Sequence, residues 1–115
     1  MSVTIYHNPR CSKSRQTLGL LEERNVETEV VKYLETPPTA EELDRILTLL
    51  GIEPEALMRK REEEYKTSGL NQSGLSRTAQ IEKMVAFPKV IERPIVVNGD
   101  RAAVGRPPEQ VLEIL

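Results

Sequence analysis

Residues 3–14 read VTIYHNPRCSKS, and this stretch determines how the first part of the chain folds. Val3 to His7 favours a short strand, and the turn formers Asn8 and Pro9 follow it. Helical periodicity then begins at Ser12. Cys11 therefore lies between a strand and a helix, where the N–H groups and positive dipole end of the helix favour a thiolate.

Cys11 is the only cysteine of the chain, so no disulfide can form within it. It begins a Cys-x-x-Ser pattern, in which Ser14 can donate a hydrogen bond to a thiolate but cannot resolve a disulfide. Many free cysteines are instead small buried hydrophobic residues. The polar neighbours of Cys11 favour the reactive thiolate, whose second thiol must come from another molecule.

Length and charge limit the class of protein. A chain of 115 residues predicts a single domain, residues 1–115. Its 16 basic and 18 acidic residues give a net charge of −2, which disfavours nucleic acid or a membrane surface as partner. The sequence shows neither the apolar run of a signal peptide nor one approaching the ~20 residues of a membrane span. We therefore expect a cytoplasmic protein, and one cysteine fits a reducing compartment.

The remaining sequence alternates helix and strand signals. Thr39 and Glu42 form a capping box for a helix that begins at Ala40, and Asn98-Gly99 predicts a type I′ hairpin turn. The other expected elements are helices at 12–24, from Pro54, at 77–86 and after Pro107-Pro108, strands at 27–33, 95–97 and 102–104, an exposed charged stretch at 60–66 and a loop at 68–76.

This order predicts an α/β fold. A βαβ start joined to a ββα end gives a small mixed β-sheet with flanking helices, the thioredoxin-like arrangement, and helical material is inserted in its middle. The βαβ connection is expected to be right-handed.

His7 is the only histidine and lies just before Cys11. An imidazolium there could stabilise the thiolate, or the ring could hold the loop through a backbone hydrogen bond. Both roles remain open on the sequence alone. One histidine and one cysteine at this spacing predict no metal site.

Three arginines suggest an anionic substrate. In thioredoxin-like folds a cis-proline faces the active cysteine, which makes Pro94 the candidate and places Arg93 beside Cys11. Arg106 follows the return strand, and Arg59 ends the short middle helix. Each arginine alone is typical of a solvated surface. Together they predict an oxyanion site, because planar guanidinium groups match pairs of oxygens.

A phosphatase of the low-molecular-weight type, or an arsenate reductase built on it, would need a Cys-x5-Arg loop. Counted from Cys11, that arginine falls at Thr17, and Arg15 comes too early. The sequence therefore disfavours this class.

The stretch YHNPRCSKSR at 6–15 resembles the active-site motif of the glutaredoxin-coupled arsenate reductases. The resemblance continues through residues 33–38, 57–60, 93–97 and 105–107, in the same order and spacing. It implies that Cys11 is the catalytic nucleophile, that Arg59, Arg93 and Arg106 bind the oxyanion, and that His7 and Ser14 keep the cysteine ionised.

The resemblance also implies partners and a role in arsenate detoxification. Arsenate would be the substrate, glutathione a co-substrate, and glutaredoxin the partner that completes the reduction to arsenite, with no bound cofactor. Arg10, Ser12 and Lys13 depart from the best-known members, and these changes either lower the pKa of Cys11 further or mark a branch with another oxyanion or little arsenate activity. Two alternatives stay open: a redox-sensing or regulatory binding module on the same fold, and a monothiol glutathione-dependent oxidoreductase.

Overall fold

A computed structural model describes residues 3–115, and the chain forms two compact units. The first unit joins the residues up to Thr36 with Arg93–Leu115, and the second is Pro37–Glu92. The second unit is the helical insertion that the sequence predicts. A single domain over residues 1–115 stays a prediction.

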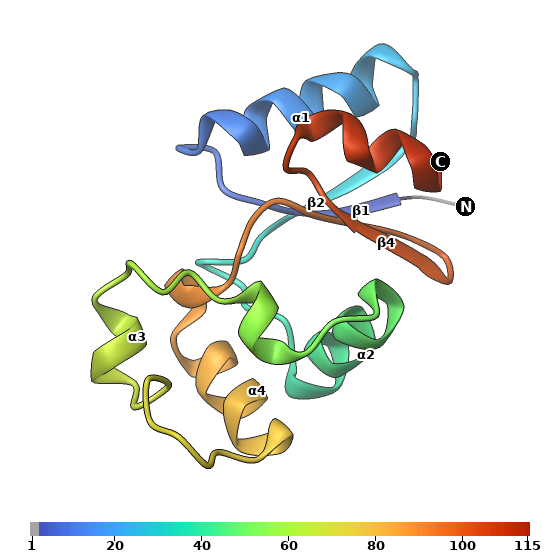
Figure 1. Ribbon diagram of the computed structural model, residues 1–115. Helices are drawn as coiled ribbons and strands as arrows, with labels where there is room; N and C mark the ends of the chain where they lie inside the picture. Colours follow the sequence, from blue (N-terminus) through green and yellow to red (C-terminus); the bar gives the residue numbers. More distant parts are fainter. Residues whose placement is uncertain (1–2) are drawn as a thin grey trace. The chain divides into compact units, whose positions relative to one another are not determined.

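The first unit contains a four-stranded mixed sheet with strand order β2-β1-β3-β4 (Figure 1). β1 pairs in parallel with β2 and antiparallel with β3, and β3 pairs antiparallel with β4. The predicted mixed sheet is therefore confirmed. The strands are β1 (Val3–His7), β2 (Thr28–Lys32), β3 (Ile95–Asn98) and β4 (Arg101–Val104).

One face of this sheet carries helix α1 (Ser12–Glu23) and the 3-10 helix η3 (Pro108–Ile114) (Figure 1). Alternate side chains of β1 are buried, as the period of a strand requires. The apolar core between these elements consists of Val3, Ile5, Leu21, Val96, Val111 and Ile114. His7 continues the buried row of β1 and so lies at the end of this core, next to the start of α1.

The second unit consists of helices, namely α2 (Ala40–Leu50), η1 (Pro54–Leu57), α3 (Glu64–Thr67), α4 (Arg77–Ala86) and η2 (Pro88–Val90). The predicted capping box is confirmed: Glu42 N–H donates to Thr39 Oγ1 at 3.1 Å, and Thr39 N–H donates to Glu42 Oε1 at 2.9 Å. Gly51 ends α2 in the left-handed region, with φ of 68°. Apolar side chains of α2 and α4 are buried, and the two helices contact each other.

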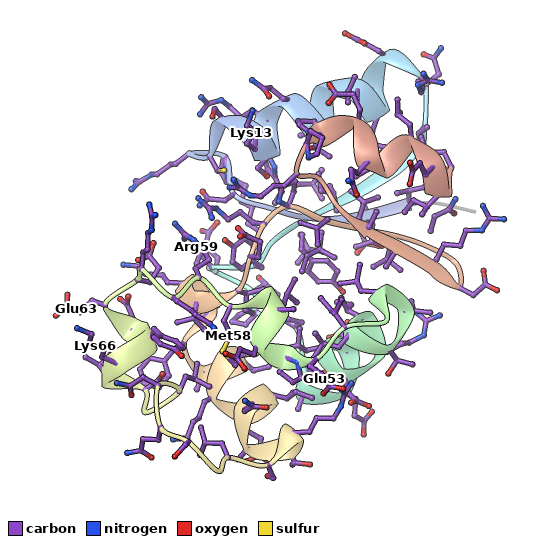
Figure 2. All side chains as sticks on the ribbon, in the orientation of Figure 1. Lys13, Glu53, Met58, Arg59, Glu63 and Lys66 are labelled. Atoms are coloured by element: carbon purple, nitrogen blue, oxygen red, sulfur yellow. The ribbon has the colours of Figure 1, made fainter. Side chains whose placement is uncertain are left out.

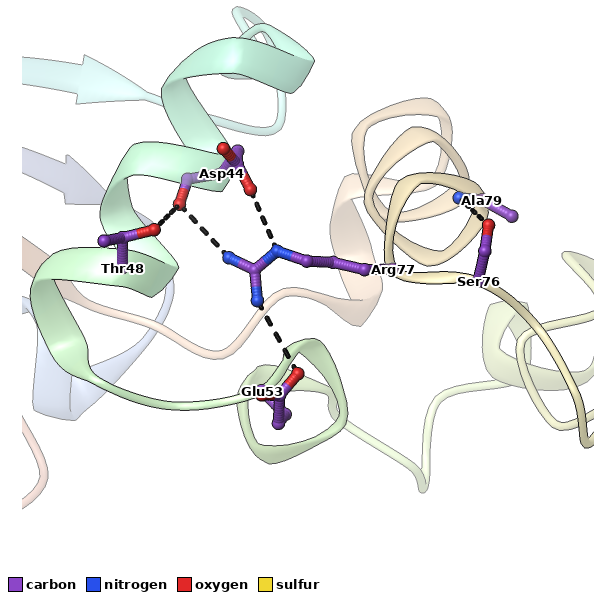
Figure 3. Close-up of polar contacts among 6 residues, drawn as sticks. All are labelled: Asp44, Thr48, Glu53, Ser76, Arg77 and Ala79. Carbon is purple, nitrogen blue, oxygen red and sulfur yellow. Dashed lines mark hydrogen bonds and ion pairs between the residues drawn. The ribbon is translucent and has the colours of Figure 1, made fainter.

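Arg77, the first residue of α4, ties three segments of the second unit together (Figure 3). Its Nε donates to Asp44 Oδ1 of α2 at 2.9 Å, and its Nη1 lies 3.6 Å from Glu53 Oε2. Ser76 caps the same helix by accepting from Ala79 N–H at 3.1 Å. The start of α4 is thus held both by its cap and by ion pairs.

The structure corrects several predictions. Asn98 pairs with Arg101, so the two-residue turn is Gly99-Asp100, and the predicted type I′ turn at Asn98-Gly99 is wrong. Asn98 stays in the strand because its side-chain amide donates to the Ile114 carbonyl at 2.6 Å. The predicted exposure of the charged stretch 60–66 is confirmed in part, since three of its residues, Glu62, Glu64 and Tyr65, are half-buried and the others are exposed. Its end forms the short helix α3, which the sequence did not predict. Within residues 3–115, no helix is long and apolar enough to cross a membrane.

Candidate active site

Cys11 is the N-cap residue of α1, with an extended backbone at φ of −95°. Its N–H donates to the Asn8 carbonyl at 3.0 Å, and its carbonyl accepts from Arg15 N–H at 3.0 Å. The Cys11 side chain makes no capping hydrogen bond. The N–H groups of Ser14 and Lys13 are nevertheless near enough to the sulfur to lower its pKa. The sulfur therefore lies in the positive field at the start of a helix, as the sequence predicts.

Two arginines distant in the sequence act on this sulfur, Arg106 by contact and Arg93 electrostatically. Arg106 Nη2 donates to Cys11 Sγ at 3.5 Å, and Arg106 Nε donates to the Arg93 carbonyl at 2.8 Å. The Arg93 guanidinium is near enough to act electrostatically on Cys11. The peptide bonds Arg93–Pro94 and Arg106–Pro107 are both cis.

These groups act on the thiol in opposite directions. Partial burial raises the pKa of Cys11, because it disfavours the charged thiolate. The Ser14 N–H, the Arg93 charge, the Lys13 N–H and the Arg106 charge all lower it. Together they outweigh burial, and the pKa of Cys11 lies below its ordinary value. Cys11 is half-buried, so its thiolate remains accessible to a small molecule.

His7 and Ser14 form a buried pair behind the cysteine. His7 Nδ1 lies 2.6 Å from Ser14 Oγ, and Ser14 Oγ also accepts from Asn8 N–H at 3.0 Å. Burial lowers the pKa of His7, and the charges of Lys32 and Arg15 lower it further. The His7 ring thus bonds to the Ser14 hydroxyl rather than to a backbone group, which differs from the predicted loop-holding bond. The lowered pKa disfavours the predicted imidazolium role.

Arg59 belongs to the second unit (Figure 2). Its Nη2 pairs with Glu62 Oε1 at 2.7 Å, its Nη1 donates to the Lys89 carbonyl at 3.3 Å, and its backbone N–H donates to the Val90 carbonyl at 2.6 Å. The guanidinium is thus oriented by its own unit. Its role as an oxyanion ligand stays a prediction.

Comparison with known proteins identifies the family. The model of the ArsC family matches residues 6–114.

The chain belongs to the ArsC family.

An arsenate reductase of Haemophilus influenzae is 47% identical over 100% of both chains. An uncharacterized Escherichia coli K12 protein, YfgD, is 57% identical over 98% of this chain and 96% of its own. The solved structure of an arsenate reductase from Vibrio cholerae is 57% identical, covers 100% of this chain and 98% of its own, and superposes with a TM-score of 0.94. The predicted thioredoxin-like fold is confirmed by this similarity.

The sequence does not reveal how this ArsC chain supports its active-site loop. Arg15 Nη1 donates to the Pro9 carbonyl at 2.9 Å, and Asn8 Oδ1 accepts from Arg10 N–H at 3.0 Å. The Asn8-Pro9 pair is a turn signal that could have suggested the second bond. Arg10, Ser12 and Lys13, the departures from well-known members, are all exposed.

The charged groups at Cys11 suit an anion. Within the described part of the chain, no three His, Cys, Asp or Glu side chains gather to hold a metal ion. A thiolate that is flanked by guanidinium groups can instead attack an oxyanion whose charge those groups neutralise.

Proposed function

We propose that this chain is an arsenate reductase whose nucleophile is the Cys11 thiolate. The observation that carries the proposal is the contact of Arg106 Nη2 with Cys11 Sγ, made beside Arg93. An anionic substrate approaching a thiolate would be repelled unless cations compensate both charges. The relatives named arsenate reductases support arsenate as that substrate.

Arg93 and Arg106 bind arsenate oxygens in this proposal, and Arg59 is the third ligand that the resemblance implies. A guanidinium group can donate two parallel hydrogen bonds to a pair of oxygens. The N–H groups at the start of α1 add positive field at the point where negative charge develops. Ser14 and His7 keep the loop, and therefore the sulfur, in place.

The first chemical step forms a bond from the Cys11 sulfur to arsenic. One arsenic–oxygen bond breaks, and the oxygen leaves as water after protonation. Glutathione then attacks arsenic, so that a second arsenic–sulfur bond forms while another oxygen leaves as water after protonation. A glutaredoxin thiolate attacks the glutathione sulfur and takes it up as a mixed disulfide, while the bond from that sulfur to arsenic breaks and its electron pair stays on arsenic. Two thiols thereby become one disulfide, and the two electrons reduce arsenic from the +5 to the +3 state. Hydrolysis of the remaining bond to arsenic releases arsenite and Cys11.

The single cysteine supports the use of outside thiols. A chain with one sulfhydryl group cannot close an internal disulfide, so each turnover needs reducing partners. Glutathione and glutaredoxin are the partners that the resemblance implies.

The test measures arsenite formed from arsenate with glutathione and glutaredoxin, for the wild type and Cys11→Ser. Serine preserves size but not thiolate chemistry, so we expect arsenite from the wild type only. If the wild type forms no more arsenite than Cys11→Ser does, the proposal is contradicted. Reduction of glutathione mixed disulfides without arsenite would indicate the monothiol oxidoreductase instead. Arsenite formed with thioredoxin but not with glutaredoxin would contradict only the choice of partner.

A further inference from the structure

Gly105 packs against α1 with no room for a side chain. A Cβ at this position would overlap the Thr17 hydroxyl and come within 2.8 Å of Pro94 Cγ and 3.1 Å of Thr17 Cγ2. Gly105, Thr17 and Pro94 are all buried, so their atoms have little freedom to move apart. The φ of Gly105 lies outside the left-handed region, and the requirement for glycine is therefore steric alone.

The two sides of this contact belong to the two groups that activate Cys11. Thr17 Oγ1 donates to the Lys13 carbonyl at 2.8 Å, in the turn of α1 whose N–H groups face the sulfur. On the other side, Gly105 N–H donates to the Pro94 carbonyl at 2.9 Å. The next residue, Arg106, reaches the sulfur. Gly105 thus connects Arg106, which contacts the sulfur, to the turn of α1 whose N–H groups face the same sulfur.

We propose that Gly105 and Thr17 are positioning residues whose contact fixes how closely the Arg106 guanidinium approaches the Cys11 sulfur. This also gives a reason for a small residue at position 17. A Cys-x5-Arg loop would carry its arginine there, whereas here a short side chain leaves space for the turn that supplies Arg106. The inference rests on the proposed role of Arg106 at Cys11, but not on arsenate as substrate.

The test follows alkylation of Cys11 by iodoacetamide against pH, which reports the pKa of the thiol and needs no arsenate. The charged groups that act on Cys11 are Arg93 and Arg106. In Gly105→Ala the added methyl pushes the turn away from α1, so the alkylation midpoint should rise by roughly half to one pH unit. Even if the protein does not reduce arsenate, the pH midpoint of Cys11 alkylation can still be measured and still tests this proposal.

Gly19→Ala is the matched control, because it makes the same change on α1 where a Cβ meets no atom within 4 Å. Its alkylation midpoint should equal that of the wild type. Thr17→Ala removes two of the three crowded atoms, so Thr17→Ala/Gly105→Ala should shift the midpoint back toward the wild type. The Pro94 ring still crowds the methyl in that variant and leaves a smaller rise.

A double-mutant cycle separates positioning from a general packing defect. Arg106→Ala raises the midpoint by itself, and Gly105→Ala should add nothing further in that background. If Gly105→Ala does not fold, the cycle is run with Thr17→Ala/Gly105→Ala, whose smaller rise should likewise vanish without Arg106. A folded Gly105→Ala protein with the wild-type midpoint, or a rise that is equal with and without Arg106, overturns the proposal.

Discussion

At Cys11, several groups together favour the thiolate. Two backbone N–H groups and two guanidinium groups lower the pKa of the thiol against the opposing effect of burial. The N–H groups are part of the helix, whereas the arginines come from segments around β3 and β4. Removal of one arginine should therefore weaken the activation without abolishing it, which permits binding and activation to be measured separately.

Arg93→Ala should affect arsenate turnover more than alkylation of Cys11. The variant loses the Arg93 guanidinium as a hydrogen-bond donor to the oxyanion. Because of this loss, we expect kcat/KM for arsenate to fall about 10²-fold. Alkylation at neutral pH should fall less than about 10-fold, because only one of several pKa-lowering groups is removed. Steady-state kinetics and iodoacetamide rates on the same preparation provide the comparison.

Arg101→Ala, which removes an exposed arginine of β4, is the control and should leave both rates unchanged. Equal losses in turnover and alkylation for Arg93→Ala would mean that Arg93 mainly activates the thiol rather than binding the substrate.

Among the elements, the beginning of α2 is the most clearly specified by local sequence. Thr39→Ala removes the side-chain acceptor for Glu42 N–H, and the free energy of unfolding should fall by about 0.5–2 kcal/mol. Thr39→Ser keeps an acceptor oxygen at the same place and should lose much less. Urea unfolding, followed by circular dichroism, measures both variants; a loss in Thr39→Ser as large as in Thr39→Ala would contradict the capping argument.

The start of α2 could be predicted because a helix cap depends on residues that are close together in the sequence. A cap acts over three residues, so the pairing of Thr39 with Glu42 can be predicted directly from the sequence. The short helix α3 was missed because its charged residues give no apolar stripe. The hairpin turn was misplaced because Asn98 is held by Ile114, a partner 16 residues away that no local pattern reveals.

The candidate site likewise combines features set by neighbouring residues with features set by contacts between distant ones. Cys11 could be predicted because a strand, a turn and a helix follow each other along the chain. The arginines near it were predicted from the expected fold and from the resemblance. The packing of Gly105 on Thr17 was not predicted, since it depends on the shapes of two segments that meet only after folding.

For the whole molecule, the lowered pKa values make stability depend on pH. The folded pKa of Cys11 lies below its ordinary value, so between the two values the unfolded chain binds more protons. The free energy of unfolding therefore rises with pH in that interval, and the contribution is lost as pH falls through the folded pKa. His7, also lowered, gives a similar rise as pH increases toward its ordinary value of 6.5.

Cys11→Ser should remove the rise that occurs from neutral to alkaline pH and keep the one due to His7. Urea unfolding at a series of pH values between about 5 and 9 measures both proteins. Parallel curves for the wild type and Cys11→Ser above neutral pH would contradict a folded-state pKa below the ordinary value.

The pairing of β1 with β3 joins Thr4 to Val97, which lie near opposite ends of the chain. During synthesis, β1 and Cys11 leave the ribosome before Arg93, β3 and Arg106 do. A nascent chain therefore carries its cysteine without the arginines that lower the pKa. The thiol therefore acquires its full nucleophilicity only after these arginines have been added and β3 has paired with β1.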